Sequence, residues 1–311
     1  MRFKVAINQQ QAHPVIHLAD TETGCTAEIF AFGGLLNAFH IPLHGTHFNC
    51  IDGFESVKEA KEKITTAFKS AKLSPFVCRL QNGQYNYNGQ SYTICKNYLG
   101  HHALHGLIYD AVYELGNITE SEEAAAISLT YQYQKNDPGF PFEYTIRLLW
   151  ELKPNNCLSV TTSINHQNEG PIPYADGWHP YFTLGGPVDQ YQLEFDADTQ
   201  LEFDKELIPT GKKIKDKRFL QKHSLENIFL DNSFELIPGG KCMLNNDQLQ
   251  LVVVPDQNYP ILQVYTPEHR KSIAIENLSG APNNFNNGIG LLMLLPNKQY
   301  HFKTSYQVTQ L

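Results

Sequence analysis

Apolar and polar residues alternate along most of this chain, a pattern typical of half-buried β-strands. In segment 126–134, AISLTYQYQ, the side chains of Ile127, Leu129, Tyr131 and Tyr133 fall on one face, and the Ser, Thr and Gln side chains fall on the other. Comparable segments lie at 143–152, 157–165, 248–254, 260–266, 271–277, 290–295 and 299–306. Because these short segments are bounded by Asn, Asp, Gly and Pro, they predict an all-β protein with antiparallel packing.

One segment has a helical period instead. In ESVKEAKEKITTAFKSAK (55–72), the residues Val57, Ala60, Ile64, Ala67 and Ala71 recur at alternating spacings of three and four. This spacing predicts one amphipathic helix over 55–72 with a single apolar stripe. We expect the helix to pack on a sheet edge rather than to bind a ligand.

The length of the chain allows one domain or two. Its 311 residues exceed the prior of ~150 residues per domain, but large β architectures often exceed ~200 residues as one unit. Since no linker, repeat or low-complexity tract interrupts the sequence, we expect a single domain over residues 1–311. A chain of this length buries roughly three quarters of its unfolded surface, so its stability requires no disulfides.

Charge and composition argue against several classes of partner. The formal net charge is −8, which disfavours nucleic-acid binding. The basic run GKKIKDKR (211–218) lies among acidic residues, and we interpret it as a solvated turn. The chain has no apolar run long enough to span a membrane, and its first residues, MRFKVAINQQQAHP, lack the apolar core of a secretory signal.

The cysteines indicate a reducing compartment. All six are scattered without a C-x-x-C pair, which predicts reduced, mostly buried thiols in a cytoplasmic protein. The sequence does not distinguish a monomer from a homodimer.

Several kinds of chemistry can be set aside from the sequence. His44 and His47 have H-x-x-H spacing, and His101, His102 and His105 cluster, but these stretches look like strand ends and loops without supporting Cys, Asp or Glu ligands. We therefore expect no metal site. The chain also lacks a G-x-S-x-G elbow, a Rossmann fingerprint and a P-loop. Acid–base chemistry without a cofactor remains, and it requires a carboxylate and a proton donor with different pKa values.

Two residues stand out as candidates for such a pair. In SIAIEN, Ile273 and Ile275 share one face of the expected strand, so Glu276 lies on the other face in an otherwise apolar segment. Glu276 is either desolvated or a strand-end residue that faces water. His179, in GWHPYF, is either functional or simply a packed and hydrogen-bonded histidine.

Taken in order, several motifs give the chain a resemblance to the aldose 1-epimerase (galactose mutarotase-like) family. SPFVCRLQNGQYNYNGQSYTI (74–94) resembles the family segment in which an arginine precedes a tight turn. HALHGL (102–107) resembles its L-H-G motif, and DGWHPYFTLGG (176–186) its H-x-Y-F-x-L motif. The remaining matches are LIPTG (207–211), FLDNSFEL (229–236), LQVYTP (262–267) and IAIENLSGAPNNFNNG (273–288).

The resemblance implies a fold and a set of roles. It implies a large antiparallel β-sandwich, the galactose mutarotase-like supersandwich, with one or two short helices. It also implies Glu276 as general base and His179 as general acid. Further, it implies that Arg79, His105, Asp231 and, less securely, Gln263 bind and orient the hydroxyls of a small-molecule sugar. No cofactor is implied.

The implied reaction is the interconversion of the α and β anomers of free hexoses of the glucose and galactose type. Glu276 would take the proton of the C1 hydroxyl while His179 protonates the ring oxygen. The ring would open to the free aldehyde, the C1–C2 bond would rotate, and closure would return the hydroxyl to the other face. Reference pKa values of ~4.3 for Glu and ~6.5 for His lead us to expect a carboxylate and an imidazolium, with nearby carboxylates favouring the protonated histidine.

Other features of the motifs carry expectations about neighbouring residues. Gly106 would leave room for a close backbone approach. Trp178 and Phe285 would pack either on the sugar or in the core. Where the family often has Asn before the arginine, this chain has Cys78, so we expect one substrate contact to be absent.

The loops beside the expected site also depart from the family pattern. Many members read L-H-G-G where this chain reads LHGLIYD (104–110), and only a short stretch separates Gln263 from Glu276. We therefore expect an altered substrate choice.

Two alternatives stay open. A hexose-6-phosphate 1-epimerase would need basic residues at the rim of the site, for which Lys96 and Arg270 are the candidates. A non-catalytic carbohydrate-binding or sensing protein on the same fold would need hydroxyl contacts but no acid–base pair, so the presence of both Glu276 and His179 disfavours it.

Overall fold

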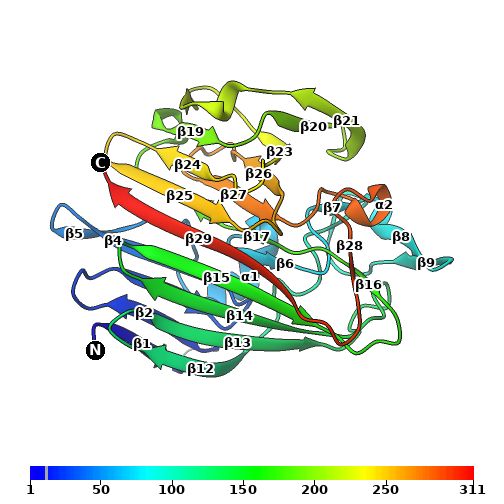
Figure 1. Cartoon of the computed structure of the whole chain (residues 1–311), viewed down its shortest axis with the longest axis horizontal. Coiled ribbons are helices and arrows are strands. Elements are labelled where there is room, and N and C mark those ends of the chain that lie inside the picture. Colours follow the sequence, from blue (N-terminus) through cyan, green and yellow to red (C-terminus); the bar gives the residue numbers. More distant parts are fainter. Residues whose placement is uncertain (11–12) are drawn as a thin grey trace.

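The computed structural model describes residues 1–10 and 13–311, and antiparallel sheets dominate it (Figure 1). The largest sheet has nine strands in the order β12-β13-β14-β15-β29-β25-β24-β19-β22. Their bounds are β12 Glu114–Glu120, β13 Ala125–Tyr133, β14 Tyr144–Lys153, β15 Cys157–Asn165, β29 Tyr300–Gln310, β25 Leu249–Pro255, β24 Cys242–Asn245, β19 Gln192–Phe195 and β22 His223–Ser224. The C-terminal strand β29 lies in the middle of this sheet, between β15 and β25 (Figure 1).

A second sheet of eight strands carries the candidate site. Its path is β21-β20-β23-β26-β27-β17-β6, and β18 also pairs with β27. The bounds are β21 Pro209–Lys215, β20 Thr199–Phe203, β23 Asp231–Glu235, β26 Ile261–Tyr265, β27 Ile273–Leu278, β17 Gly177–His179, β6 Ala71–Leu73 and β18 Tyr181–Phe182.

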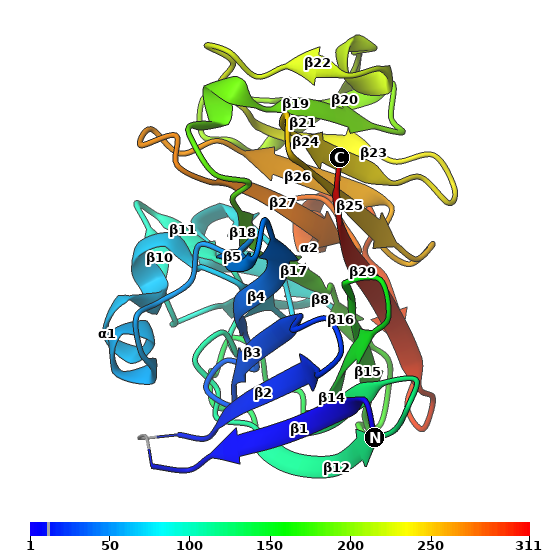
Figure 2. The same cartoon turned by 90° about the vertical axis from the view of Figure 1, so that its left-hand side faces the viewer.

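Smaller sheets complete the architecture. An N-terminal meander of five strands packs against β12 to β14 of the nine-stranded sheet (Figure 2). Its strands are β1 Phe3–Asn8, β2 Val15–Asp20, β3 Thr26–Phe30, β4 Leu36–Leu43 and β5 Thr46–Asn49. Three small sheets pair β10 Tyr98–Leu99 with β11 His102–Leu104 and β7 Arg79–Leu80, β16 Ile172–Tyr174 with β28 Leu292–Leu294, and β8 Gln84–Tyr87 with β9 Gln90–Thr93.

The prediction of antiparallel all-β packing is confirmed. The strand expected over 157–165 has those bounds in β15, and those expected over 126–134 and 143–152 correspond to β13 and β14 with ends shifted by one residue. Side chains from near both ends of the chain, Phe3 and Val308, belong to one continuous buried cluster. On that ground we propose that the chain forms one domain.

The predicted helix is real but shorter than expected. Helix α1 spans Val57–Ala67, begins at an N-cap in which Ser56 accepts a hydrogen bond from the Glu59 amide, and ends at Phe68, which adopts a left-handed conformation with φ of 54°. Ala71, assigned to the helix from its spacing, instead begins strand β6. The second helix is a single turn, α2 Asn284–Asn287.

The composition of the basic run at 211–218 predicted a solvated turn, and this prediction is wrong. The first residues of the run belong to β21, an exposed strand at the edge of the eight-stranded sheet. Lys212, Lys213 and Lys215 are exposed along it and face Glu202, Glu235 and Asp198. Lysines on an edge strand discourage pairing with another chain, which is a structural use for this charge.

Candidate active site

The strand register of the eight-stranded sheet brings distant polar residues into one row. Ser233 on β23 pairs with Gln263 on β26, and Gln263 pairs with Glu276 on β27. Residues directly opposite each other on neighbouring antiparallel strands project from the same face. The three side chains therefore share one face, although they come from three separate segments of the chain.

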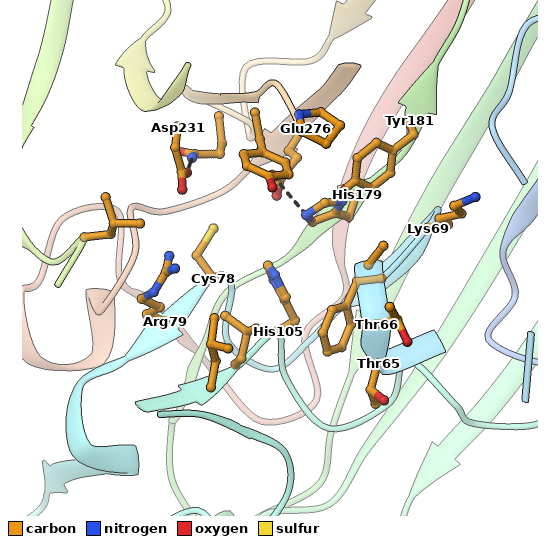
Figure 3. Close-up of a pocket in the computed structure, with 18 of the residues that line it drawn as sticks. Thr65, Thr66, Lys69, Cys78, Arg79, His105, His179, Tyr181, Asp231 and Glu276 are labelled. Carbon is orange, nitrogen blue, oxygen red and sulfur yellow. Dashed lines mark hydrogen bonds and ion pairs between the residues drawn. The ribbon is translucent and has the colours of Figure 1, made fainter. Parts of the chain in front are cut away.

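The same register extends the row to His179. Gly177 on β17 pairs with Leu278 on β27, so two positions further along each antiparallel strand His179 lies opposite Glu276. The His179 Nε2 atom is 3.3 Å from Oε1 of Glu276, and the two residues are 4 % and 2 % exposed (Figure 3). Glu276 is therefore a desolvated residue and not one that faces water, and His179 is buried beside it.

Asp231 and Gln263 form a hydrogen-bonded unit beside this pair. The Gln263 amide donates to Asp231 Oδ1 at 2.7 Å and accepts from the Ser233 hydroxyl at 2.5 Å, which fixes the orientation of the amide. Arg79, on β7, lines the same cavity and points toward Asp231 (Figure 3).

His105 reaches the site from a tight turn after β11. Its ring centroid lies 4.9 Å from that of His179 in an edge-to-face arrangement, and its backbone has a φ of 61°. The following Gly106 has a φ of 77°, and a Cβ there would stand 2.3 Å from the Ser74 carbonyl oxygen. Gly106 therefore permits a close approach between two chain segments, and that approach places His105.

All six predicted site residues line one cavity of about 620 Å³. This volume lies within the roughly 300–1,000 Å³ of small-molecule sites. Residues that the sequence did not single out also line it, from the end of α1, from β18 and β20, and from several loops. They include Asp52, Thr65, Thr66, Phe68, Lys69, Tyr181, Phe203, Leu207, Tyr265, Glu268 and His269.

Some of these residues could have been found from the sequence. Tyr181 follows His179 by two positions and Tyr265 follows Gln263 by two, so strand alternation places each on the face of its partner. The residues at the end of α1 gave no such signal. The helix was expected to pack on a sheet edge, yet Thr65 to Lys69 form part of the cavity wall.

Burial sets the protonation of the central pair. It raises the pKa of the Glu276 carboxyl well above its usual range, an effect that the Asp231 charge reinforces and Arg79 opposes. Burial also lowers the pKa of His179 to about 4. Both shifts favour a neutral carboxyl and a neutral imidazole over the carboxylate and imidazolium that the reference pKa values led us to expect, because desolvation opposes both charged forms.

The flanking polar groups are affected in the same way. Burial lowers the pKa of His105 well below its usual value, with smaller contributions from His179 and Arg79. Burial likewise raises the pKa of Asp231, while Arg79 and the hydrogen bond from Gln263 hold it down. Burial therefore favours the neutral form of the His105 imidazole.

Three buried polar atoms of this cluster have no hydrogen-bond partner among the described residues: Nδ1 of His105, Nδ1 of His179 and Oε2 of Glu276. Buried polar groups in native proteins are almost always paired, so such a concentration of unpaired atoms is typical of a site that binds a ligand.

One group among residues 1–10 and 13–311 has the spacing of metal ligands, namely His101, His102 and Glu206. The Asn82 amide donates to His102 Nδ1 at 3.0 Å, so the neutral ring carries its proton on Nε2, the atom that faces Glu206 at 3.5 Å. A protonated nitrogen has no lone pair to offer a metal. With its proton on Nε2, His102 faces Glu206 as a donor and not as a metal ligand.

Four other candidates from the sequence lie outside the cavity. Trp178 and Phe285 are buried in the hydrophobic core. Lys96 pairs with Asp110, while Arg270 binds Asp189 and backbone carbonyl oxygens. The proposal that Lys96 and Arg270 form a basic rim is therefore wrong, because both cations are engaged elsewhere.

Cys78 lies in the cavity wall between Arg79 and Glu276 in a left-handed conformation with φ of 49°. Burial raises its thiol pKa well above the usual value, so the thiol stays neutral. All six cysteines are free thiols. Among the described helices, none has the length and apolar character needed to cross a membrane.

Comparison of the sequence with known proteins gives the family. A family model described as aldose 1-epimerase matches residues 14–307, so the chain belongs to the aldose 1-epimerase family. The uncharacterized protein YihR of Escherichia coli K12 is 28% identical over 249 residues, which cover 77% of this chain and 79% of that protein. An aldose 1-epimerase of Streptococcus thermophilus is 24% identical, covering 72% of this chain and 67% of its own.

Solved structures confirm the galactose mutarotase-like fold. A galactose mutarotase-like protein from Clostridium acetobutylicum superposes with a TM-score of 0.86 at 17% identity, covering 99% of this chain and 98% of its own. Galactose 1-epimerase from Lactobacillus acidophilus gives 0.82 at 18% identity, covering 100% and 99%.

Proposed function

We propose that this protein is an aldose 1-epimerase that interconverts the α and β anomers of free hexoses. The observation that carries the proposal is the buried contact of 3.3 Å between His179 Nε2 and Glu276 Oε1 in the wall of a cavity. An acid and a base held this close to each other suit a reaction in which one substrate proton is removed while another is supplied.

The proposed steps balance in protons. Glu276, as carboxylate, takes the proton of the C1 hydroxyl, the C1–O5 bond breaks as the C1 carbonyl forms, and O5 receives a proton from His179 Nε2. The C1–C2 bond then rotates, and the reverse transfers close the ring with the hydroxyl on the other face. Each positioned acid or base contributes typically ~10²–10⁴ in rate.

The proton inventory of the pair suits this cycle. The neutral pair that burial favours has the same proton count as the ion pair needed to begin ring opening, so only a transfer from Glu276 to His179 is required. Arg79 lowers the pKa of Glu276 and thereby stabilises the carboxylate. After ring opening the pair is neutral again, which is the state preferred in this desolvated site.

Charges at the cavity favour free sugars over 6-phosphates. Two of the lining residues are cations: Lys69 already donates to Asp52 at 2.6 Å, and Arg79 lies beside Asp231 (Figure 3). Lys96 and Arg270 lie elsewhere. A dianionic phosphate would meet the carboxylates of Asp52, Asp231 and Glu268, which line the same cavity.

A cytoplasmic location remains a prediction, and the six free thiols are consistent with it.

Polarimetry tests the proposal. Freshly dissolved α-D-glucose and α-D-galactose should relax to anomeric equilibrium faster with the protein than without it. Acceleration of the hexose 6-phosphate alone would identify the phosphate-specific activity instead. Sugar binding without any acceleration would identify a sensing protein and end the epimerase proposal.

A further inference from the structure

A charged pair that the proposed mechanism does not use lies directly behind the site. Lys72 on β6 and Asp176 are both fully buried and form an ion pair. The Lys72 ammonium also donates to the Gly177 carbonyl oxygen at 3.1 Å and lies 4.5 Å from the centroid of the Trp178 ring. The Lys72 ammonium thus contacts three consecutive residues, Asp176 to Trp178, that lead to His179.

Asp176 gathers several strands through its own hydrogen bonds. Its carboxylate accepts from the hydroxyls of Tyr174 at 2.8 Å and Tyr259 at 2.6 Å. Its backbone amide donates to the Ser279 hydroxyl at 2.8 Å, and its carbonyl oxygen accepts from the Ser279 amide at 2.8 Å. Asp176 and Ser279 are therefore clamped together by two hydrogen bonds.

The two hydrogen bonds between Asp176 and Ser279 lie at the end of the paired strands β17 and β27, which carry His179 and Glu276. Asp176 immediately precedes β17 and Ser279 immediately follows β27. The next residues inward pair as Gly177 with Leu278, and two positions further the same register brings His179 opposite Glu276. A shift of one residue at the clamp would turn His179 away from Glu276, because side chains alternate between faces.

Lys72 lies on the face opposite the cavity. It pairs with Trp178, whereas the preceding Ala71 pairs with His179. Since neighbouring residues of a strand point to opposite faces, Lys72 acts from behind the sheet and has no route to the sugar.

The same network extends beneath His105. The Ser74 hydroxyl bonds the Tyr174 hydroxyl at 3.0 Å, and the Ser74 carbonyl oxygen accepts from the Leu107 amide at 2.7 Å. Ser74 also forms the bridge to Gly106 that fixes the turn carrying His105. One chain of buried polar contacts thus joins the supports of His105, His179 and Glu276.

Such a pair contributes little to stability in general. Burial of two charges is costly, and replacement of a buried ion pair by uncharged residues of similar volume is often neutral or stabilising. Burial lowers the pKa of Lys72 to about 8 while Asp176 opposes the shift, which shows the desolvation that the lysine suffers. The contribution of this ion pair therefore lies in where it holds the neighbouring strands and not in the free energy of unfolding.

We propose that Lys72 and Asp176 are positioning residues, which hold strand β17 in register with β27 so that His179 Nε2 meets the Glu276 carboxyl. The inference rests on the proposed epimerase function. It assigns no contact with substrate to either residue.

The test is the double variant Lys72→Met/Asp176→Asn, which removes both charges and keeps the side-chain volumes and an acceptor for Tyr174. We expect near-native circular dichroism and melting temperature, a kcat for galactose mutarotation reduced about 10-fold or more, and a KM within about twofold, since a misplacement of ~1 Å can cost ~10²-fold in rate. The acid limb of the kcat–pH profile should also move, because the coupling of His179 to Glu276 depends on their separation.

The matched control is Arg2→Met/Asp20→Asn in the N-terminal sheet, where Arg2 binds a carboxylate that is 1 % exposed. A purely structural role would give both variants the same behaviour, with altered melting and an unchanged pH profile. A folded Lys72→Met/Asp176→Asn protein with native kcat and pH profile would overturn the inference. An inactive wild-type protein would instead overturn the function on which it rests.

A milder variant covers the case in which the double variant does not fold. Ser279→Ala removes one of the two clamping hydrogen bonds and leaves both charges in place. We expect a several-fold loss of kcat with an unchanged KM and a displaced acid limb, and native values of all three would contradict the proposal.

Discussion

The Nε2 atom of His179 lies 3.3 Å from Oε1 of Glu276, in the interior of a sheet and at the wall of a cavity. The contact follows from strand register, since β17 and β27 are antiparallel neighbours and the two residues are opposite positions on them. Four further residues, Arg79, His105, Asp231 and Gln263, line the same cavity, and we propose that they bind the hydroxyls of one sugar.

Glu276→Gln tests the proposed base. The amide keeps the volume and hydrogen-bonding capacity of the side chain but cannot accept the C1 hydroxyl proton, so we expect a rate loss on the order of 10²-fold or more. Polarimetry with α-D-galactose measures it. Glu151→Gln on β14, outside the cavity, serves as control and should retain the wild-type rate. Activity of Glu276→Gln within a few-fold of wild type would remove Glu276 from the mechanism.

The pH dependence should reflect one proton shared by the pair. As pH falls, a second proton enters the pair on His179, whose pKa burial lowers to about 4, so activity should persist below the ordinary histidine value of ~6.5. As pH rises, the shared proton leaves only above the usual glutamate range, because burial raises the pKa of Glu276. The measurement is kcat/KM against pH, corrected for spontaneous mutarotation. An acid limb centred near 6.5 would refute the assignment, which concerns the pair as a whole.

Cys78→Asn tests substrate selection. The left-handed backbone at this position suits Asn, and an amide would add hydrogen-bonding capacity next to Arg79. One hydrogen bond of about 0.5–1.5 kcal/mol corresponds to a decrease of roughly 2–10-fold in KM for glucose or galactose. Cys78→Ala is the control that removes the thiol and adds no amide. Identical KM values for the two variants would show that no sugar hydroxyl faces this position.

Gly106→Ala tests how the His105 turn is held. A methyl group would stand 2.3 Å from the Ser74 carbonyl oxygen, at a φ of 77°. Left-handed strain and overpacking together predict a loss of about 2–4 kcal/mol in the free energy of unfolding, measured by denaturant titration. Gly45→Ala is the matched control, because Gly45 has a φ of 79° and nothing within 4 Å of the added methyl. Equal losses in the free energy of unfolding of both variants would show that the close approach to Ser74 adds nothing to the cost of the substitution.

Local pattern was sufficient to predict the strands and much of the site. Alternation predicted β13, β14 and β15 to within about one residue, because each strand buries one face and alternation records that burial directly. The motifs around His179 and Glu276 marked both residues, and the structure brings them together with the four expected hydroxyl-binding residues.

The helix shows where such patterns fail. The apolar spacing continued past Ala67 to Ala71, yet Phe68 turns left-handed and Ala71 joins β6 beside His179. A strand partner contributed by residues about a hundred positions away decided that boundary. Thr65 to Lys69 likewise lie in the cavity wall because of segments distant along the chain, so no local signal could have placed them there.

By itself the sequence determined the antiparallel β class, the presence of one substantial helix, and the identity of the polar residues grouped at the site. Each of these is recorded in short-range periodicity or in motifs. Only the tertiary structure decided that burial shifts the pKa values of Glu276 and His179 toward their neutral forms, that Lys96 and Arg270 lie elsewhere, and that Lys72 and Asp176 lie behind the pair. Protonation, charge pairing and register all depend on which distant segments exclude water from one another, and that information resides in long-range packing.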